Sequence, residues 1–147
     1  MKIAIGSDHA AFKMKEHLKE YLSKKGIEVI DMGPETEERV DYPVYAKKVC
    51  DKVVNNEVDY GILMCGTGLG MSIAANKVKG IRATLAYYPK MAELARQHNN
   101  ANVLVLGGRT MGFELAEWTV DTFLSTDFEG GRHERRINLI SEMEENL

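Results

Sequence analysis

The chain has 147 residues, of which 44% are hydrophobic and 28% charged, and its formal net charge is −3. This length suits a single domain over residues 1–147, and the composition is ordinary for a soluble globular protein. The acidic balance argues against a nucleic-acid partner. No apolar run is long enough to cross a membrane, and the N-terminus carries no signal peptide, so we expect no membrane partner and a cytoplasmic location.

Apolar runs and turn residues predict short strands separated by helices. The first strand covers residues 2–5, and the helix after it closes at Gly26. A second strand over residues 27–30 leads through a polar loop to a helix that opens at Tyr42-Pro43. Cys50 falls on the inward face of that helix and is expected to be a core residue rather than a reactive one. A disulfide with Cys65 is not expected in the cytosol.

The alternation continues in the second half of the chain. An apolar run at residues 62–64 forms a third strand, and residues 81–86 and 102–106 form the fourth and fifth. Pro89 suits the first turn of a helix that runs to about residue 97. Another helix covers residues 114–124. The last helix carries an apolar stripe of Ile137, Ile140, Met143 and Leu147.

Strands that alternate with helices predict an α/β fold. We expect a five-stranded, parallel, Rossmann-like sheet inside a three-layer α/β/α sandwich, followed by a C-terminal helix. Ligands of such folds bind beyond the carboxyl ends of the strands. That edge of the sheet is therefore where the chemistry is expected.

The third strand ends in a cysteine and a loop with glycine at every second position: Cys65, Gly66, Gly68 and Gly70. Glycine lets the backbone approach a ligand closely, and free N–H groups at the start of the next helix favour an anion. The same positive potential favours the thiolate form of Cys65. A base beside an anion hole is what proton abstraction next to a carbonyl requires. The alternative is a structural glycine turn with a buried cysteine.

The glycine spacing excludes several familiar phosphate sites. Met71 occupies the place of the third glycine in a dinucleotide-binding loop, and no acidic residue ends the next strand to hold a ribose. The chain has no Gly-Lys-Ser/Thr, so it has no P-loop. Met71 also replaces the arginine of a Cys-x5-Arg phosphatase loop.

Other polar residues follow neighbouring strands at the same edge. Asp8 and His9 follow the first strand, and Arg109 follows the fifth. Each alone has a simpler explanation, Asp8 as a helix cap, His9 as a surface residue and Arg109 as a solvated charge. Their convergence with the glycine loop favours a functional site.

His98, Arg132 and Arg136 do not fit this edge, because the helices before them run back to the opposite side of the sheet. A five-residue strand spans roughly 16 Å, so His98 should not reach Cys65 of its own chain. It could reach Cys65 of a second chain. We therefore predict a two-fold homodimer with shared sites, and the apolar stripe of the last helix offers a contact surface.

Five motifs in this order resemble ribose-5-phosphate isomerases of the B type. They are Gly6-Ser7-Asp8-His9-Ala10, Asp41-Tyr42-Pro43, Cys65-Gly66-Thr67-Gly68-x-Gly70, Arg96-Gln97-His98-Asn99 and Glu129-Gly130-Gly131-Arg132-His133. The match runs from the first strand to the last helix. It implies an enzyme of the pentose phosphate pathway that interconverts ribose 5-phosphate and ribulose 5-phosphate through a cis-enediolate.

The resemblance also implies catalytic roles. Cys65 would move the proton between C1 and C2, with the amides of Gly66, Gly68 and Gly70 holding the enediolate oxygen. Thr67 would act at the sugar oxygens. His98 would open the sugar ring, a task that suits an imidazole of pKa about 6.5, with Asp8 assisting.

The implied binding residues surround this centre. Tyr42 and Asn99 would bind sugar hydroxyls, while His9, Arg109, Arg132 and Arg136 would bind the phosphate, for which guanidinium groups are suited. Arg109 is the least secure, since some relatives carry a small residue there. No metal and no cofactor is expected. The Arg132–Arg136 segment could instead be a solvated helix start or a nucleic-acid-binding patch. The neighbouring acidic residues Glu129 and Glu134 argue against nucleic-acid binding.

Two rival functions remain open. A hexose-6-phosphate isomerase, acting on allose or galactose 6-phosphate, would need more depth between Cys65 and the arginines. A non-catalytic sensor of phosphate ligands would bind a sugar phosphate without exchanging its hydrogens with solvent.

Overall fold

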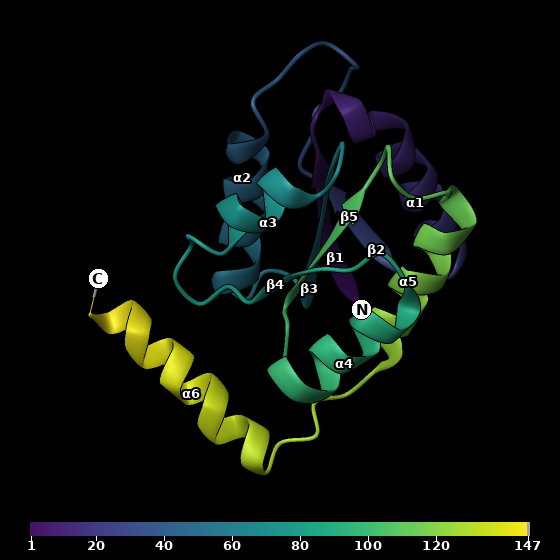
Figure 1. Ribbon diagram of the computed structural model, residues 1–147. Coiled ribbons are helices and arrows are strands. Elements are labelled where there is room, and N and C mark those ends of the chain that lie inside the picture. The colour runs from purple at the N-terminus through teal and green to yellow at the C-terminus, as the bar shows by residue number, and fades with distance from the viewer. Residues whose placement is uncertain (147) are drawn as a thin grey trace.

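Five parallel strands form one sheet in the order β2-β1-β3-β5-β4 in a computed structural model that describes residues 1–146 (Figure 1). The strands are β1 Lys2–Ser7, β2 Glu28–Asp31, β3 Tyr60–Cys65, β4 Ala83–Leu85 and β5 Val103–Gly107. The helices are α1 Phe12–Lys24, α2 Tyr42–Val54, α3 Leu69–Ala75, α4 Pro89–Asn99, α5 Phe113–Ser125 and α6 Arg132–Glu145, with a short 3-10 turn at His9–Ala11. The parallel α/β fold and its five strands are as predicted.

Helices cover both faces of the sheet, which confirms the three layers (Figure 1). Because side chains alternate along a strand, Ile3 and Ile5 point to one face and Ala4 to the other. The first face packs against α1, α4 and α5, and the second against α2 and α3. The three central strands, β1, β3 and β5, thus bury apolar side chains on both faces, as strands inside a parallel sheet do.

Several predicted boundaries are wrong by one or two residues. The first strand extends past residue 5 to Ser7, because Gly6 and Ser7 continue to pair with Leu63 and Met64 of β3. A side chain at Gly6 would come within 2.9 Å of Val49, so glycine here serves the close approach of α2. The fourth strand is shorter than residues 81–86, because it lies at the sheet edge and the Arg82 N–H turns to the Asn102 side chain.

Helix α6 extends away from the α/β body (Figure 1). Of its predicted apolar stripe, Ile137 is buried, whereas Ile140 and Met143 are 44% and 69% exposed; Leu147 lies outside the described residues. A groove of about 480 Å³ runs between α6 and the body, with Ile81 and Ala95 on its other wall. Within residues 1–146, none of the helices combines the length and apolar character that crossing a bilayer would need.

A buried ion pair joins α1 to the end of β2. The side chain of Lys15 is fully buried, and its ammonium donates to Asp31 at 2.7 Å and to Glu16 at 2.9 Å. Burial by itself would raise the pKa of Asp31, but hydrogen bonds from Lys15, Lys19 and the Gly33 N–H outweigh it and lower the pKa below the usual 3.8. The carboxylate therefore stabilises the fold as long as it is ionised.

We expect Asp31→Asn to lower the free energy of unfolding by about 3 kcal/mol, because it leaves a buried ammonium with one partner fewer. Urea denaturation measures this. In the matched control, Asp51→Asn removes the exposed partner of Lys47 and should cost less than about 0.5 kcal/mol.

The pH dependence gives a second readout of the same pair. Because the folded pKa of Asp31 lies below its unfolded value, the stabilisation is complete above about pH 4 and is lost as the pH falls through the folded pKa. The difference in unfolding free energy between wild type and Asp31→Asn should therefore shrink in acid. An undiminished difference near pH 2 would contradict the assignment.

Candidate active site

The glycine loop begins where β3 ends and reaches α3 within three residues. Gly68 has φ of 84°, a left-handed conformation that favours glycine, and a side chain there would come within 2.5 Å of Leu85. The ring of Tyr42 lies over Gly70, where an added Cβ would come within 2.6 Å of it. Two of the three glycines are thus required by the local geometry of the loop.

Hydrogen bonds fix the loop through its carbonyl groups. The carbonyls of Met64, Cys65 and Gly66 accept from the N–H groups of Asp8, Gly108 and Arg109, at 3.2, 2.8 and 2.8 Å. Within the described part of the chain, by contrast, the N–H groups of residues 66, 67, 68 and 70 have no acceptor. The loop therefore presents amides, not carbonyls, to a ligand.

The two cysteines lie in different surroundings. Cys65, the last residue of β3, is 5% exposed on the α2–α3 face of the sheet. Cys50 lies on the buried face of α2 and is completely buried, and burial raises the pKa of its thiol to about 12. Both are free thiols, as predicted. Only Cys65 combines partial access with neighbouring unpaired amides.

Asp8 and Thr67 each cap the local backbone. Asp8 is buried, and its Oδ1 accepts the N–H groups of Ala10 and Ala11 at 2.9 and 3.2 Å. The hydroxyl of Thr67 accepts the N–H of Leu69 at 3.2 Å. Asp8 is therefore a helix cap in the structure, which is the simpler of its two explanations. Its Oδ2 has no hydrogen-bond partner among residues 1–146.

His9 and Arg109 meet beside the glycine loop, as the sequence predicts. The Arg109 side chain passes over Gly66, at 3.5 Å from the position of an added Cβ. With His9 and Lys13 it lines a cavity of about 410 Å³. The Nδ1 atom of His9 accepts the Val40 N–H at 3.3 Å, which orients its ring. Lys13 adds a cation that the sequence analysis did not identify.

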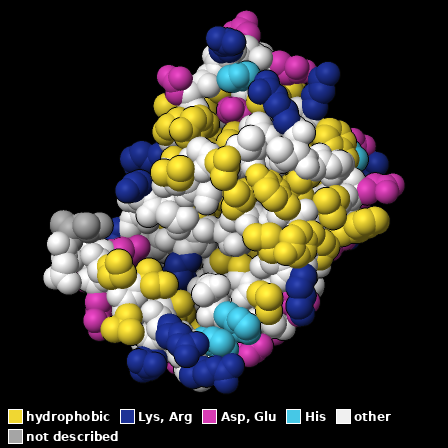
Figure 2. Space-filling view, viewed as in Figure 1, with side chains coloured by type: hydrophobic (Ala, Val, Ile, Leu, Met, Phe, Trp, Pro, Cys, Tyr) yellow, Lys and Arg dark blue, Asp and Glu magenta, His cyan; other side chains and the backbone are white. Residues whose placement is uncertain are grey.

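The remaining predicted residues lie at the opposite edge of the sheet. The Gly61 N–H at the start of β3 donates to the Asn102 carbonyl, so the chain just after α4 is level with the amino end of that strand. His98 and Asn99 end α4 there, and Arg132 and Arg136 lie in the first turns of α6. Histidine and basic side chains gather at this end of the molecule (Figure 2). About 13 Å of β3 separates it from Cys65.

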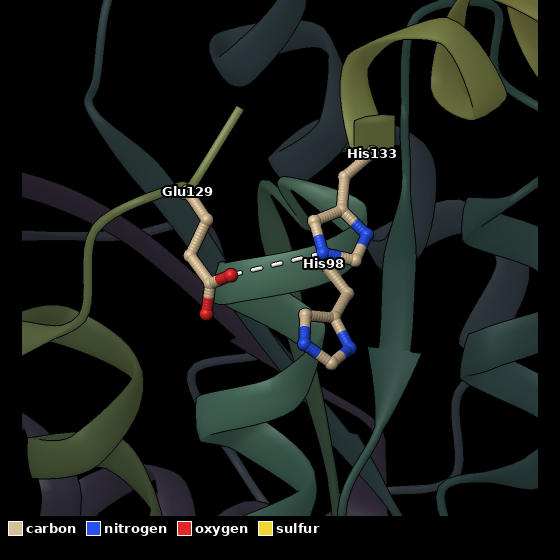
Figure 3. A group of neighbouring side chains, drawn as sticks. All are labelled: His98, Glu129 and His133. Carbon is tan, nitrogen blue, oxygen red and sulfur yellow. Dashed lines mark ion pairs between the residues drawn. The ribbon is translucent and has the colours of Figure 1, made fainter. Parts of the chain in front are cut away.

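His98 and His133 stack on one another in this second cluster (Figure 3). Their ring centroids are 4.3 Å apart and their planes are 12° from parallel. With Glu129 they offer three possible metal-binding atoms within 4.8 Å of one another. Two features are unfavourable for a cation: parallel rings do not aim their lone pairs at one point, and Arg132 and Arg136 add positive charge nearby.

Comparison with known proteins identifies the family of the chain. Residues 3–140 match the Ribose/Galactose Isomerase family. The chain belongs to this family. It is 50% identical over 144 residues to ribose-5-phosphate isomerase B of Escherichia coli, covering 98% of this chain and 97% of that protein.

Solved structures of family members share the fold. A ribose 5-phosphate isomerase from Thermotoga maritima superposes with a TM-score of 0.95 at 67% identity, over 96% of this chain and 97% of that one. Ribose-5-phosphate isomerase B from Mycoplasma genitalium, solved with bound ribulose-5-phosphate, gives a TM-score of 0.94 at 47% identity, over 99% and 97%.

Two residues that support the site were missed by sequence reasoning. Tyr87 donates its hydroxyl to the Thr67 carbonyl at 2.8 Å and so holds the glycine loop. Arg96 is buried, donates to the carbonyls of Ala101 and Thr126, and lies over the ring of Tyr60. It fixes the end of α4 that carries His98. Arg96 opens the motif that contains His98, but the sequence gives no sign that this arginine is buried, so only the packing identifies its role.

Alkylation should distinguish the two cysteines. In the folded protein, iodoacetamide is expected to modify Cys65 while Cys50 stays unmodified, because the thiolate is the reactive form and the Cys50 thiol is both covered and held protonated. Peptide mapping by mass spectrometry measures each site, and labelling in urea gives the control in which both react. Equal labelling of both cysteines in the native state would contradict the assignment.

Proposed function

We propose that this chain interconverts D-ribose 5-phosphate and D-ribulose 5-phosphate, in the pentose phosphate pathway. The observation that carries this proposal is the set of unpaired loop amides beside Cys65 at the end of β3. The family relationship supports the substrate, since the Escherichia coli relative is a ribose-5-phosphate isomerase B and the Mycoplasma genitalium structure contains ribulose-5-phosphate.

The proton transfer is assigned to Cys65. The thiolate removes the hydrogen from C2 of the open-chain aldose, and the electron pair moves through C1 onto the aldehyde oxygen to give the cis-enediolate. Amides of Gly66, Gly68 and Gly70 stabilise this negative oxygen, which is the largest single contribution in many such reactions. Thr67 moves the hydroxyl proton between the two oxygens, and Cys65 returns its proton to C1, which leaves the ketone at C2.

Substrate binding is assigned to both edges of the sheet. His9 and Arg109, which line the same cavity, bind the phosphate together with Arg132 and Arg136. Planar guanidinium groups suit a phosphate because they donate two parallel hydrogen bonds. Tyr42, whose ring lies over Gly70, and the exposed Asn99 bind sugar hydroxyls.

Ribose 5-phosphate is mostly a closed ring, so a ring-opening step precedes isomerisation. His98 takes the proton from the C1 hydroxyl and delivers a proton to the ring oxygen as the bond between C1 and that oxygen breaks. An imidazole suits this step because it gains and loses a proton near neutral pH. The unpartnered Oδ2 of Asp8 assists at the sugar oxygens. No metal or organic cofactor takes part.

A two-fold homodimer would bring these groups together. His98, Arg132 and Arg136 lie at the amino edge of the sheet, whereas Cys65 lies at the carboxyl edge, so one chain alone does not combine them. The exposed Ile140 and Met143 of α6 offer an apolar surface that a second copy would cover. In such an isologous dimer each chain supplies His98 and the two arginines to the site of its partner. The two free thiols suit a cytoplasmic location.

Cys65→Ala is expected to lower the turnover of ribose 5-phosphate by more than about 100-fold, the magnitude expected for a lost general base, with binding retained. Coupled assays give kcat, and calorimetry gives the affinity. Cys50→Ala is the matched control and should keep its activity, because that thiol lies in the core. Comparing kcat/KM for ribose 5-phosphate with kcat/KM for allose 6-phosphate and galactose 6-phosphate tests whether the preferred substrate is a pentose or a hexose phosphate. Full activity of Cys65→Ala would overturn the mechanism.

Mixing the Cys65→Ala and His98→Ala chains tests the shared site. Neither variant alone is active, but a heterodimer contains one site with both groups intact. After unfolding and refolding an equal mixture, random pairing should restore roughly one quarter of the wild-type sites. The control is a mixture of Cys65→Ala with itself after the same treatment. No recovery from the mixed chains would rule out sharing.

A further inference from the structure

The rings of His133 and His98 are stacked, with 4.3 Å between their centroids and 12° between their planes, and Figure 3 shows them next to one another. Neither ring nitrogen of His98 has a hydrogen-bond partner among residues 1–146. The stack is therefore a contact that restrains the orientation of the His98 ring without a hydrogen bond. A face contact also leaves both ring nitrogens of His98 free, whereas a hydrogen bond would occupy one of them.

His133 is itself held in place. It is only 7% exposed, and its Nε2 lies 3.7 Å from a carboxylate oxygen of Glu129. The Glu129 N–H donates to the Gln97 carbonyl at 3.1 Å, and the His133 N–H donates to the Gly130 carbonyl at 3.2 Å. The turn before α6 is thus attached to the last turn of α4, with the two imidazoles at the junction.

The surroundings of His133 keep its ring neutral. Burial lowers its pKa, and the neighbouring His98, Arg132 and Arg136 lower it further, while Glu129 acts in the opposite direction. A neutral ring packs against His98 without repelling the proton that His98 must gain during ring opening. It is an aromatic support that does not compete for that proton.

We propose that His133 is a positioning residue, whose ring orients the imidazole of His98 and keeps the start of α6, with Arg132 and Arg136, at a fixed offset from it. This inference rests on the proposed function, in which His98 opens the sugar ring and the arginines bind the phosphate. Phosphate and ring oxygen are parts of one substrate, so the groups that contact them must be held in register. A misplacement of about 1 Å can cost a hundredfold in rate.

The reaction itself separates ring opening from isomerisation. Ribulose 5-phosphate cannot close a furanose ring, because the oxygen that would close it carries the phosphate. Exchange of its C1 hydrogen with deuterium from the solvent, measured at saturating ribulose 5-phosphate, therefore requires Cys65 and the amide loop but no ring opening. Turnover of ribose 5-phosphate reports ring opening as well. A variant that loses only the positioning of His98 should separate these two measurements.

Three variants make the test, measured by NMR for exchange and by a coupled assay for turnover. His133→Ala removes the stack and should lower kcat on ribose 5-phosphate roughly tenfold to a hundredfold, while C1 exchange stays within about twofold of wild type. His133→Phe keeps a flat, neutral ring and should restore most of the turnover. His98→Ala should lose turnover by about 100-fold and keep exchange. Thermal melting and gel filtration establish that each variant folds and assembles as the wild type does.

Each result decides a separate question. Wild-type turnover by His133→Ala, or an equal loss of turnover and exchange, would overturn the positioning role. A folded His133→Phe as impaired as His133→Ala would overturn the stack as its basis. Full turnover of ribose 5-phosphate by His98→Ala would instead overturn the ring-opening step of the proposed function. Loss of turnover with exchange retained in His133→Ala, and rescue by His133→Phe, supports the proposal.

Discussion

Three hydrogen bonds to the carbonyl groups of Met64, Cys65 and Gly66 organise the end of the sheet. Their donors are the N–H groups of Asp8, Gly108 and Arg109, which begin the loops after β1 and β5. The three loops are thereby joined into one surface. The carbonyls at this point are used for these contacts, whereas the N–H groups of residues 66, 67, 68 and 70 have no acceptor among residues 1–146. This row of unpaired amides thus follows from how the central strands end rather than from a long helix, since α3 has only seven residues.

The fold divides the chemistry between two edges of one sheet. Parallel strands place a thiol, amides and a cationic cavity at their carboxyl ends, and the returning helices place His98 and two arginines at the other end. In the homodimer that we propose, a second chain would combine them, and the exposed apolar side chains of α6 offer a contact surface.

Support for the second cluster comes from two buried side chains, Arg96 and His133. The guanidinium of Arg96 is buried, but it donates hydrogen bonds to the carbonyls of Thr126 and Ala101. These bonds offset the cost of burying the charge and fix the chain after α4. His133 is buried and neutral, and the nearby arginines help to keep it so. The same environment that disfavours a metal ion therefore favours a rigid stack beneath His98. The charges around His133 and the packing of its ring both favour a neutral ring stacked on His98.

The sequence by itself determined the α/β class, the five parallel strands, the glycine loop after Cys65 and the family resemblance, because alternating patterns and motif spacing are local properties of the chain. It also placed His98 and the arginines at the far edge, since helix direction follows from strand order. Only the tertiary structure decided strand ends, which depend on pairing with neighbours, as at Ser7 with Met64. The burial of Lys15 and Arg96 and the stack of His133 on His98 likewise arise from contacts between residues distant in sequence, which no local pattern encodes.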